Sequence, residues 1–284
     1  MIRVMLVPNE LYEASVEAAS KLEAWLDDQL IDVVRPPRFG NDSEACLEGV
    51  DLVVSLGGDG TLLRAARLVG SLQIPILGLS FGHLGFLTAD ANLDQADMFQ
   101  LVGQALAQEL HVTRRAALAV VVEGYDREGN ETTLRTNAVN EVVLARGASG
   151  RMVEFDVSAN GVHIDRLRGD GFVVSTATGS TGYALSAGGP IVTPDFTGLV
   201  CVPIAPHTIT ARAFVTSPSD VVELQVASDR SSDPTIFIDG ESPFESIAPC
   251  RLTVSRADYD IVLLSARDQA FFESVSRVFY GKVR

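Results

Sequence analysis

The sequence predicts a two-domain fold in which an N-terminal α/β domain with a parallel sheet precedes an all-β domain. Strand-like and helix-like segments alternate through residues 1–111, a pattern that implies right-handed βαβ units. From 112 to 266 the segments are short, β-branched and separated by turn residues, and no long helical period occurs. A helical pattern with one apolar face returns over 267–284, and we expect that helix to pack back on the first domain.

The first domain switches repeatedly between the two periodicities. Strands are expected at four short apolar segments, residues 2–7, 31–34, 51–56 and 74–79. Helices are expected where apolar residues recur three and four positions apart, at 11–26, 61–69 and 94–110. A glycine-containing loop, 82–85, follows the fourth strand.

The second domain carries one strong hairpin signal. Asn160 and Gly161 separate two strand-like segments, 153–158 and 162–167, and this pair of turn residues favours a two-residue hairpin loop. Residues 252–265 add further strand-like runs. The apolar residues that predict the tail helix are Ala270, Phe271, Val275, Val278 and Phe279.

The chain has 284 residues and a formal net charge of −15, with an isoelectric point near 4.6. Binding to nucleic acid or to an anionic membrane needs clustered Lys and Arg, so this acidity argues against both partners. It does not argue against a nucleotide, because a small anion needs only a ring of backbone amides and a few arginines.

The three cysteines, Cys46, Cys201 and Cys250, fit neither a metal-ligand spacing nor a disulfide framework, which favours a reducing cytosol. The first residues lack the apolar stretch and cleavage site of a signal peptide. No run approaches the ~18 apolar residues of a membrane span. We therefore expect a cytoplasmic protein.

A first candidate site is the segment Gly57-Gly58-Asp59-Gly60-Thr61, between a buried-type strand and a helix. Ligands of open α/β sheets bind beyond the carboxyl ends of the strands, where glycines and a helix N-terminus accommodate phosphate. Thr61 offers a helix cap or a hydroxyl, and Asp59 fits a group that holds a ribose hydroxyl, takes its proton or binds Mg²⁺. The structural alternative is a tight turn with Asp59 as helix cap. The segment matches neither the Gly-x-Gly-x-x-Gly dinucleotide fingerprint nor the Walker loop.

A second candidate site is the block 169–190, in which six residues are Gly and six are Ser or Thr. No ordinary strand or helix needs this composition, so we interpret the block as a wall of hydroxyls and amides around a polar ligand. Tyr183 adds a flat surface on which a base can stack, and Asp170 is a carboxylate between two glycines. The alternative is a small-residue loop within an all-β domain.

Other polar residues are weaker signals on their own. Asn140 and Glu141 precede a strand-like run and also fit a turn. Arg151 and Arg168 fit surface cations, and His207 fits a loop cap. None of these positions has the spacing of a metal-ligand motif, and no protein-borne metal site is expected.

In their order and spacing, these segments resemble the NAD kinases. The resemblance rests on 57–61, on Asn140-Glu141 and on the 169–190 block, with further agreement at 84–87 and 205–207, and it covers about residues 50–245. The first motif alone is shared with diacylglycerol, sphingosine and phosphofructokinase families, whereas the second block narrows the resemblance to NAD kinases. It implies a Rossmann-like first domain, a β-sandwich second domain and NAD lying between them.

The resemblance also implies an activity and roles for individual residues. NAD kinases transfer the γ-phosphoryl group of ATP, with a divalent metal such as Mg²⁺, to the 2′-hydroxyl of the adenosine ribose of NAD, and they form homodimers or homotetramers. Asp59 matches the family's proposed proton acceptor. The implied phosphate-binding residues are Gly57, Gly58, Gly60 and Thr61. The implied NAD-binding residues, some of them reaching a neighbouring subunit, are Asp59, Gly60, Arg64, Asn140, Glu141, Arg151, Arg168, Asp170, Thr178, Thr181, Gly182, Tyr183, Ala184, Leu185, Ser186, Ala205 and Glu241.

Five positions depart from the family pattern, and none of them is a residue proposed for catalysis. Ser80 replaces the family's Asn, and Glu241 replaces Gln or Arg. Ala177 and Ala213 each replace Pro, and Gly182 replaces Ala. Two other functions stay open. A lipid or sugar kinase could use the same Gly-Gly-Asp-Gly-Thr domain, although the tyrosine-bearing block argues against it. A non-catalytic NAD(P)-binding sensor is compatible with the changes at Ser80 and Glu241.

Overall fold

The chain folds into two compact units, each with its own apolar core. The structure is a computed structural model that describes residues 1–36, 44–81, 85–88, 94–227, 233–242, 247–266 and 271–281. Unit 1 comprises Met1–Arg114 and Asp260–Arg284, and unit 2 comprises Arg115–Tyr259. Two long strands, β5 (His111–Tyr125) and β15 (Ala248–Ser265), run from one unit into the other.

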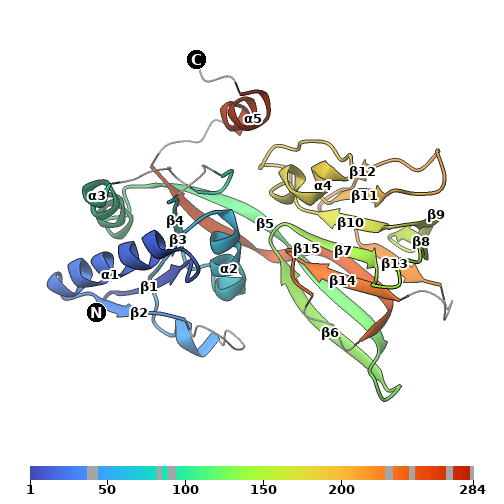
Figure 1. Ribbon diagram of the computed structural model, residues 1–284, viewed down its shortest axis with the longest axis horizontal. Helices are drawn as coiled ribbons and strands as arrows, with labels where there is room; N and C mark the ends of the chain where they lie inside the picture. Colours follow the sequence, from blue (N-terminus) through green and yellow to red (C-terminus); the bar gives the residue numbers. More distant parts are fainter. Residues whose placement is uncertain are drawn as a thin grey trace. The chain divides into compact units, whose positions relative to one another are not determined.

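Unit 1 is built on a parallel sheet whose strand order is β2-β1-β3-β4 (Figure 1). The end of β15 adds a further parallel strand beside β4, where Leu263 pairs with Ile76. Both β3 and β4 are buried at every position, which is typical of parallel strands covered on both faces. The strands are β1 (Arg3–Pro8), β2 (Asp32–Val34), β3 (Leu52–Leu56) and β4 (Ile76–Leu79).

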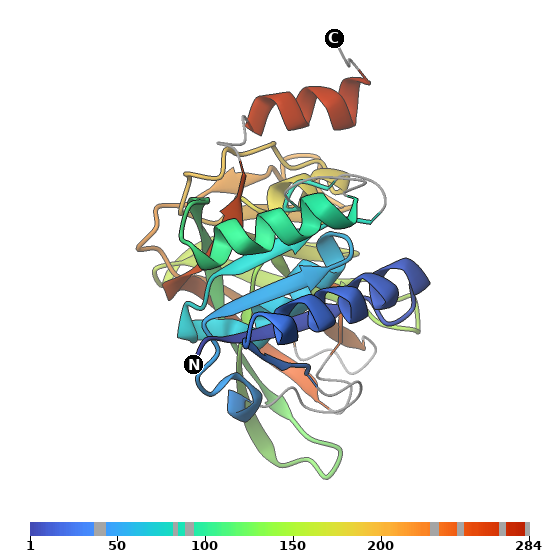
Figure 2. The same cartoon turned by 90° about the vertical axis from the view of Figure 1, so that its left-hand side faces the viewer.

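Helices cover both faces of this sheet (Figure 2). Helices α1 (Glu13–Asp28) and α3 (Gln95–Leu106) share one apolar cluster with Leu77 and Leu79 of β4. Gly78, between these two leucines, faces the other way because neighbouring strand residues point to opposite faces. A Cβ on Gly78 would overlap the Leu62 side chain of α2 (Asp59–Val69), so α2 packs closely on that second face.

Several helix ends differ from the bounds expected from the sequence, among them the start of α2 and the end of α3. Helix α2 begins at Asp59 rather than at 61, so Asp59 lies in its first turn. Its N-cap is Gly58 and no side chain caps it, so the expectation that Asp59 or Thr61 serves as a helix cap is wrong. Helix α3 ends at Leu106 rather than at 110, because Gln108 adopts a left-handed φ of 59° that stops the helix.

Unit 2 is a sandwich of two sheets. One sheet has the order β15-β13-β8-β9, with β5 pairing with β15 and β6 pairing with β5; the other has the order β12-β11-β10-β7-β14. Apart from β5 and β15, the strands are β6 (Glu131–Ala138), β7 (Glu141–Arg146), β8 (Val153–Ala159), β9 (Val162–Gly169), β10 (Gly171–Ser175), β11 (Val200–Ile204), β12 (Phe214–Val215), β13 (Val222–Val226) and β14 (Pro234–Ile238).

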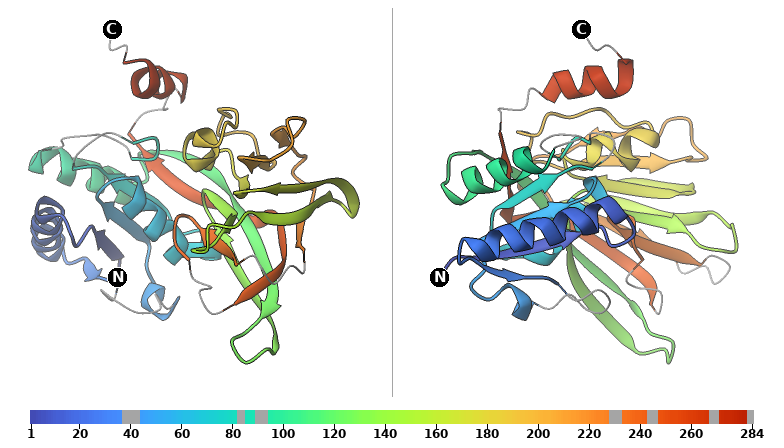
Figure 3. Two further views of the ribbon diagram at one scale, coloured as in Figure 1. Left: turned by 45° about the vertical axis from the view of Figure 1, so that its right-hand side comes forward. Right: turned by 60° about the vertical axis from the view of Figure 1, so that its left-hand side comes forward.

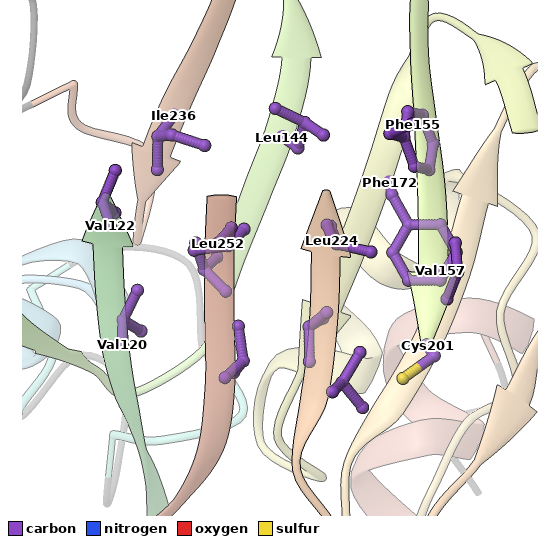
Figure 4. Packing of buried hydrophobic residues seen from close by; sticks show 14 of the residues in the cluster. Val120, Val122, Leu144, Phe155, Val157, Phe172, Cys201, Leu224, Ile236 and Leu252 are labelled. Carbon is purple, nitrogen blue, oxygen red and sulfur yellow. The ribbon is translucent and has the colours of Figure 1, made fainter. Parts of the chain in front are cut away.

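The core of unit 2 lies between these two sheets (Figure 4). Phe155 of β8 and Phe172 of β10 meet edge to face there, with ring centroids 5.9 Å apart. Leu144 of β7 joins the same core, whereas its neighbour Val143 belongs to a smaller cluster on the opposite face of its sheet. The alternation along β7 thus buries both faces of the second sheet.

The predicted hairpin is confirmed. Strands β8 and β9 pair antiparallel across Asn160 and Gly161, which have positive φ values of 51° and 75° (Figure 3). Two consecutive left-handed residues match the right-handed twist of the flanking strands, and Asn-Gly adopts that conformation at low cost. Local sequence therefore determines this part of the fold.

Helix α5 (Phe271–Tyr280) belongs to unit 1 and contacts it through aromatic rings. The ring centroids of Phe271 and Phe279 lie 6.5 and 5.6 Å from that of Phe86. The predicted fold class, an α/β domain and an all-β domain with a C-terminal helix packing back on the first, is confirmed. No helix in the described part of the chain combines the length and apolar character needed to cross a membrane.

Candidate active site

The first candidate segment forms the turn between β3 and α2, at the carboxyl end of the parallel sheet. Gly57 has a φ of 157°, and a Cβ there would overlap the side chain of Thr61. The N–H of Gly57 donates to the carbonyl of Leu79 at 2.9 Å, so this group is committed to the sheet rather than free for phosphate. Gly58 and Gly60 are exposed and have open space where a Cβ would lie. The backbone open to an anion is therefore that of Gly58, Gly60 and the start of α2.

Asp59, in the first turn of α2, is oriented by the segment that follows β4. The N–H of Phe86 donates to its Oδ2 at 2.9 Å, and the N–H of Leu87 donates to its Oδ1 at 3.3 Å. A Cβ on Gly85 would overlap the same carboxylate, so the absence of a side chain there makes the approach possible. Each oxygen retains lone-pair capacity for a further donor, such as a substrate hydroxyl.

Two other residues of unit 1 follow β3 and β4 in the chain. Arg64 is half-buried on α2, and Ser80, one of the five departures from the family pattern, is 1% exposed directly after β4. The sequence pattern around Gly85 gives no sign that the two following amides bind Asp59, because that contact joins residues 27 and 28 positions apart.

In unit 2 a single carboxylate holds the turn between β6 and β7. Asp239 accepts hydrogen bonds from the backbone N–H groups of Val139, Asn140 and Glu141, at 2.9, 2.7 and 3.1 Å. The N–H of Asp239 in turn donates to the carbonyl of Glu141 at 3.0 Å. The N–H of Thr176 donates to the carbonyl of Asn140 at 2.8 Å. Asp239 is a site residue that the sequence pattern did not predict, because its local signal is no more than its place before Gly240 at a strand end.

Glu141 and Asn140 both present buried acceptor atoms that lack a partner. Glu141 is 8% exposed, and burial, with a further contribution from the charge of Asp239, raises its pKa to about 7. Within the described residues, neither Oε2 of Glu141 nor Oδ1 of Asn140 has a hydrogen-bond partner. Leaving a buried polar atom unpaired costs roughly 1–3 kcal/mol, so these atoms suit a ligand that donates hydrogen bonds.

The Gly/Ser/Thr block is a strand followed by a turn and a short helix, not a continuous loop. Residues Gly171–Ser175 form β10, which is buried at every position. Small residues are needed there: a Cβ on Gly171 would overlap the carbonyl of Leu144, and one on Gly179 would overlap that of Asn140. A 3₁₀ turn, η3 (Gly179–Thr181), and α4 (Tyr183–Ser186) follow.

Three hydroxyls of this block serve the backbone instead of facing a ligand. Ser175 Oγ donates to the carbonyl of Asn140 at 3.0 Å, and Thr176 Oγ1 donates to that of Val139 at 2.7 Å. Ser180 Oγ donates to the carbonyl of Ala177 at 2.7 Å. The interpretation of the block as a wall of ligand-facing hydroxyls is wrong for these three, because buried hydroxyls need partners and the turn supplies them.

Other predicted residues of the block differ in what they present. Tyr183 is 45% exposed, and a Cβ on Gly182 would lie 3.7 Å from Oε2 of Glu141. Ala184 is completely buried in the small cluster with Val143, so its methyl group faces the protein. The structure also describes Thr178, whose carbonyl accepts a hydrogen bond from Thr181 Oγ1, the half-buried Leu185 and the exposed Ser186.

The remaining predicted residues lie in loops of unit 2 and, for Arg168, near the end of β9. Arg151, Arg168 and Glu241 are exposed, as is Ala205, which has a positive φ of 42°. The carboxylate of Asp170 pairs with Arg146 at 3.2 Å. The N–H of His207 donates to the carbonyl of Arg168 at 2.8 Å, which joins the two segments through the backbone.

The described part of the chain contains a cavity but no metal-ligating cluster. No group of three His, Cys, Asp or Glu side chains that could hold a metal ion occurs among the described residues. A cavity of 540 Å³ in unit 1 is lined by Ile2, Asp51 and Pro75, which precede β1, β3 and β4. It therefore lies at the amino ends of the strands, opposite the end that carries Asp59.

Comparisons with known proteins bear on both units. The model of the ATP-NAD kinase N-terminal domain matches residues 43–110, and that of the C-terminal domain matches 139–266. An NAD kinase of Geobacter metallireducens is 36% identical over 262 residues, which cover 90% of each chain. An NAD kinase of Caldanaerobacter subterraneus is 31% identical over 282 residues, which cover 96% of this chain and 97% of the relative.

Solved structures give the same result. An NAD kinase from Archaeoglobus fulgidus in complex with ATP superposes with a TM-score of 0.72 at 25% identity, over 99% of this chain and 97% of that one. Yeast NADH kinase complexed with NADH has a TM-score of 0.87 at 21% identity, over 100% of this chain and 89% of that one, and supports the fold. Because both domain models match and relatives with 36% identity align over 90% of the chain, the chain belongs to the ATP-NAD kinase family.

Proposed function

We propose that this chain transfers the γ-phosphoryl group of ATP to the 2′-hydroxyl of the adenosine ribose of NAD, with NADP and ADP as products. The observation that carries this proposal is the Asp59 carboxylate, held by two backbone N–H groups at the carboxyl end of a parallel sheet. Phosphoryl transfer passes through a loose transition state, so an enzyme accelerates it mainly by positioning and by neutralising charge. A carboxylate of fixed direction suits the task of orienting one hydroxyl.

Asp59 is proposed to accept a hydrogen bond from the 2′-hydroxyl and to take its proton as the P–O bond forms. General-base assistance of this kind contributes roughly 10²–10⁴-fold. The rest of the acceleration then comes from alignment of the two substrates and from charge neutralisation around the phosphates. The exposed backbone of Gly58 and Gly60 at the start of α2 supports a role in holding phosphate, because a helix N-terminus attracts anions.

Asn140 and Glu141 are proposed to recognise the adenosine part of NAD. Their buried acceptors, Oδ1 and Oε2, have no partner within the described residues, and adenosine supplies an amino group and ribose hydroxyls as donors. The exposed ring of Tyr183 follows Gly182, which lies beside Glu141, and is proposed to stack on a base. Exposed Arg151 and Arg168 stay candidates for contacts with NAD, within one subunit or across a homodimer or homotetramer.

A divalent metal, Mg²⁺, is proposed to enter as part of the ATP substrate. The chain carries a net charge of −15, so a metal ion on the phosphates would offset repulsion between the protein and ATP. The proposed setting is the cytoplasm, with which the thiols of Cys201 and Cys250, not joined in a disulfide, agree.

The test mixes the protein with NAD, ATP and MgCl₂ and measures NADP with an NADP-specific dehydrogenase. Steady NADP formation that requires both substrates is the expected result. Binding of NAD without NADP formation would instead favour a non-catalytic sensor. Transfer of labelled phosphate to lipid or sugar, but not to NAD, would favour the other kinase families.

A further inference from the structure

We propose that Asp239 is a positioning residue for NAD binding: its carboxylate fixes the Asn140-Glu141 turn in the geometry that presents both side chains to the ligand. The inference rests on the proposed function, because recognition of adenosine by Asn140 and Glu141 is part of that function. Asp239 lies at the end of β14 and is 98 to 100 positions from the amides that it binds.

The geometry is that of a carboxylate enclosed by a run of amides. Both oxygens are used, since Oδ2 accepts from Val139 and Oδ1 accepts from Asn140 and Glu141. The reciprocal bond from the N–H of Asp239 to the carbonyl of Glu141 closes the arrangement. Charge-assisted hydrogen bonds are shorter and stronger than neutral ones, and four contacts leave the turn little freedom to rotate.

Asp239 and Gly240 form a tight two-residue turn between Ile238 and Glu241. The φ of 46° at Asp239 lies in the left-handed region, which such a turn requires and which Asp tolerates better than most residues. The next residue, Gly240, also has a positive φ of 83°, and a bridge joins Ile238 to Glu241. The chain thus turns sharply at the point where the carboxylate meets the three amides.

The choice of Asp also has an electrostatic consequence. Its charge adds to burial in raising the pKa of Glu141 to about 7. Burial, with smaller contributions from the charges of Asp258 and Asp239, raises the pKa of Tyr259 of β15 to about 12, which keeps the phenol neutral under assay conditions. A neutral Asn would hold some of the amides without this repulsion. Asp239 is therefore expected to have two separable effects: its hydrogen bonds position the Asn140-Glu141 turn, and its charge raises the pKa of Glu141.

The experiment measures NAD affinity by calorimetry from pH 5.5 to 9 on the full chain and on Asp239→Asn. An amide has one acceptor oxygen in place of two, so the turn loses at least one hydrogen bond in Asp239→Asn. At high pH, where NAD affinity no longer changes with pH (the plateau), we therefore expect that affinity to fall by about 10-fold or more. An ionised Glu141 accepts donors from NAD more strongly, so affinity should rise with pH through its pKa, near 7 in the native chain. Removing the neighbouring charge lowers that pKa and moves the rise to lower pH.

Asp126→Asn is the matched control. Asp126 also accepts backbone N–H groups, those of Glu128 and Asn130 at 2.8 and 2.9 Å, but it lies in the turn between β5 and β6 of the same unit. The control variant should keep the native NAD affinity at the high-pH plateau and the native midpoint of the pH dependence. Glu141→Gln in the native background should abolish the pH-dependent rise, which assigns the midpoint to Glu141.

An Asp239→Asn plateau within two-fold of the native value, with an unchanged midpoint, would overturn the inference. If that variant does not fold, Asp239→Glu takes its place. It keeps the charge, but its longer side chain misaligns the hydrogen bonds to the amides. NAD affinity at the high-pH plateau should then fall, while the midpoint of its pH dependence should stay near 7. Native affinity in Asp239→Glu would equally overturn it. Absence of NAD binding by the native chain would instead contradict the proposed function.

Discussion

The backbone N–H of Phe86 lies 2.9 Å from Oδ2 of Asp59, and this hydrogen bond joins the first turn of α2 to the segment after β4. The direction of the proposed catalytic carboxylate is therefore set from outside its own helix. The Phe86 ring also contacts Phe279 of α5, with centroids 5.6 Å apart. One residue thus touches Asp59 through its backbone and the C-terminal helix through its side chain.

Replacing Asp59 with Asn should leave NAD binding within a few-fold and lower kcat by roughly 10²-fold or more, because the amide cannot take the hydroxyl proton. NADP formation gives kcat, and calorimetry gives the affinity for NAD. Asp51→Asn is the matched control, since Asp51 also accepts a backbone N–H, that of Arg3 at 2.9 Å, at the opposite end of β3. Near-normal turnover of Asp59→Asn would remove this residue from the proposed role.

A methyl group at Gly85 should displace the Asp59 carboxylate, because a Cβ there would overlap it. A misplacement of about 1 Å at a reacting group costs on the order of 10²-fold in rate, so Gly85→Ala should lose most of its kcat. Gly103→Ala, in α3, is the control: its Cβ would meet only Trp25, at 4.0 Å, and alanine favours a helix. Equal kcat values for the two variants would contradict the prediction.

Truncating the aromatic contact between α5 and Phe86 should loosen the segment that holds Asp59. In Phe279→Ala we expect faster hydrogen exchange at the amides of Phe86 and Leu87 and a lower kcat, with the KM for NAD changed less. Tyr280→Ala is the comparison, because that side chain is 67% exposed. Unchanged exchange in Phe279→Ala would show that α5 does not constrain this segment.

Stability should depend on pH through Glu141. The pKa of this acid is about 7 in the folded chain and 4.5 in the reference state, so between these values the folded state binds more protons than the unfolded state. The free energy of unfolding should therefore decrease as pH rises from 4.5 to 7, by up to about 3 kcal/mol from this group. Denaturant unfolding at a series of pH values measures this change in the free energy of unfolding.

Glu141→Gln provides the control for that measurement, because a glutamine does not titrate. The variant should lose this component of the pH dependence and should gain stability relative to the native chain above pH 7. An identical slope in the two proteins would mean that Glu141 is not the group responsible.

The order of strands and helices, the Asn160-Gly161 hairpin and the two glycine-rich segments follow from local sequence. Periodicity and turn chemistry depend on neighbouring residues, so they predict the α/β and all-β parts. The motifs at 57–61, 140–141 and 169–190 carry the resemblance that family comparison confirmed. Local patterns could not show that Asp59 would bind amides 27 and 28 positions away, or that Asp239 would bind amides 98 to 100 positions away.

Tertiary structure also decided which polar groups are available to a ligand. The hydroxyls of Ser175, Thr176 and Ser180 look equivalent in sequence to those of their neighbours, yet they bond to backbone carbonyls. Glu141 precedes an apolar strand like many turn residues, but packing buries it and leaves Oε2 without a partner among the described residues. Burial and pairing depend on segments that only the folded chain brings together, and for that reason they could not be predicted from the sequence.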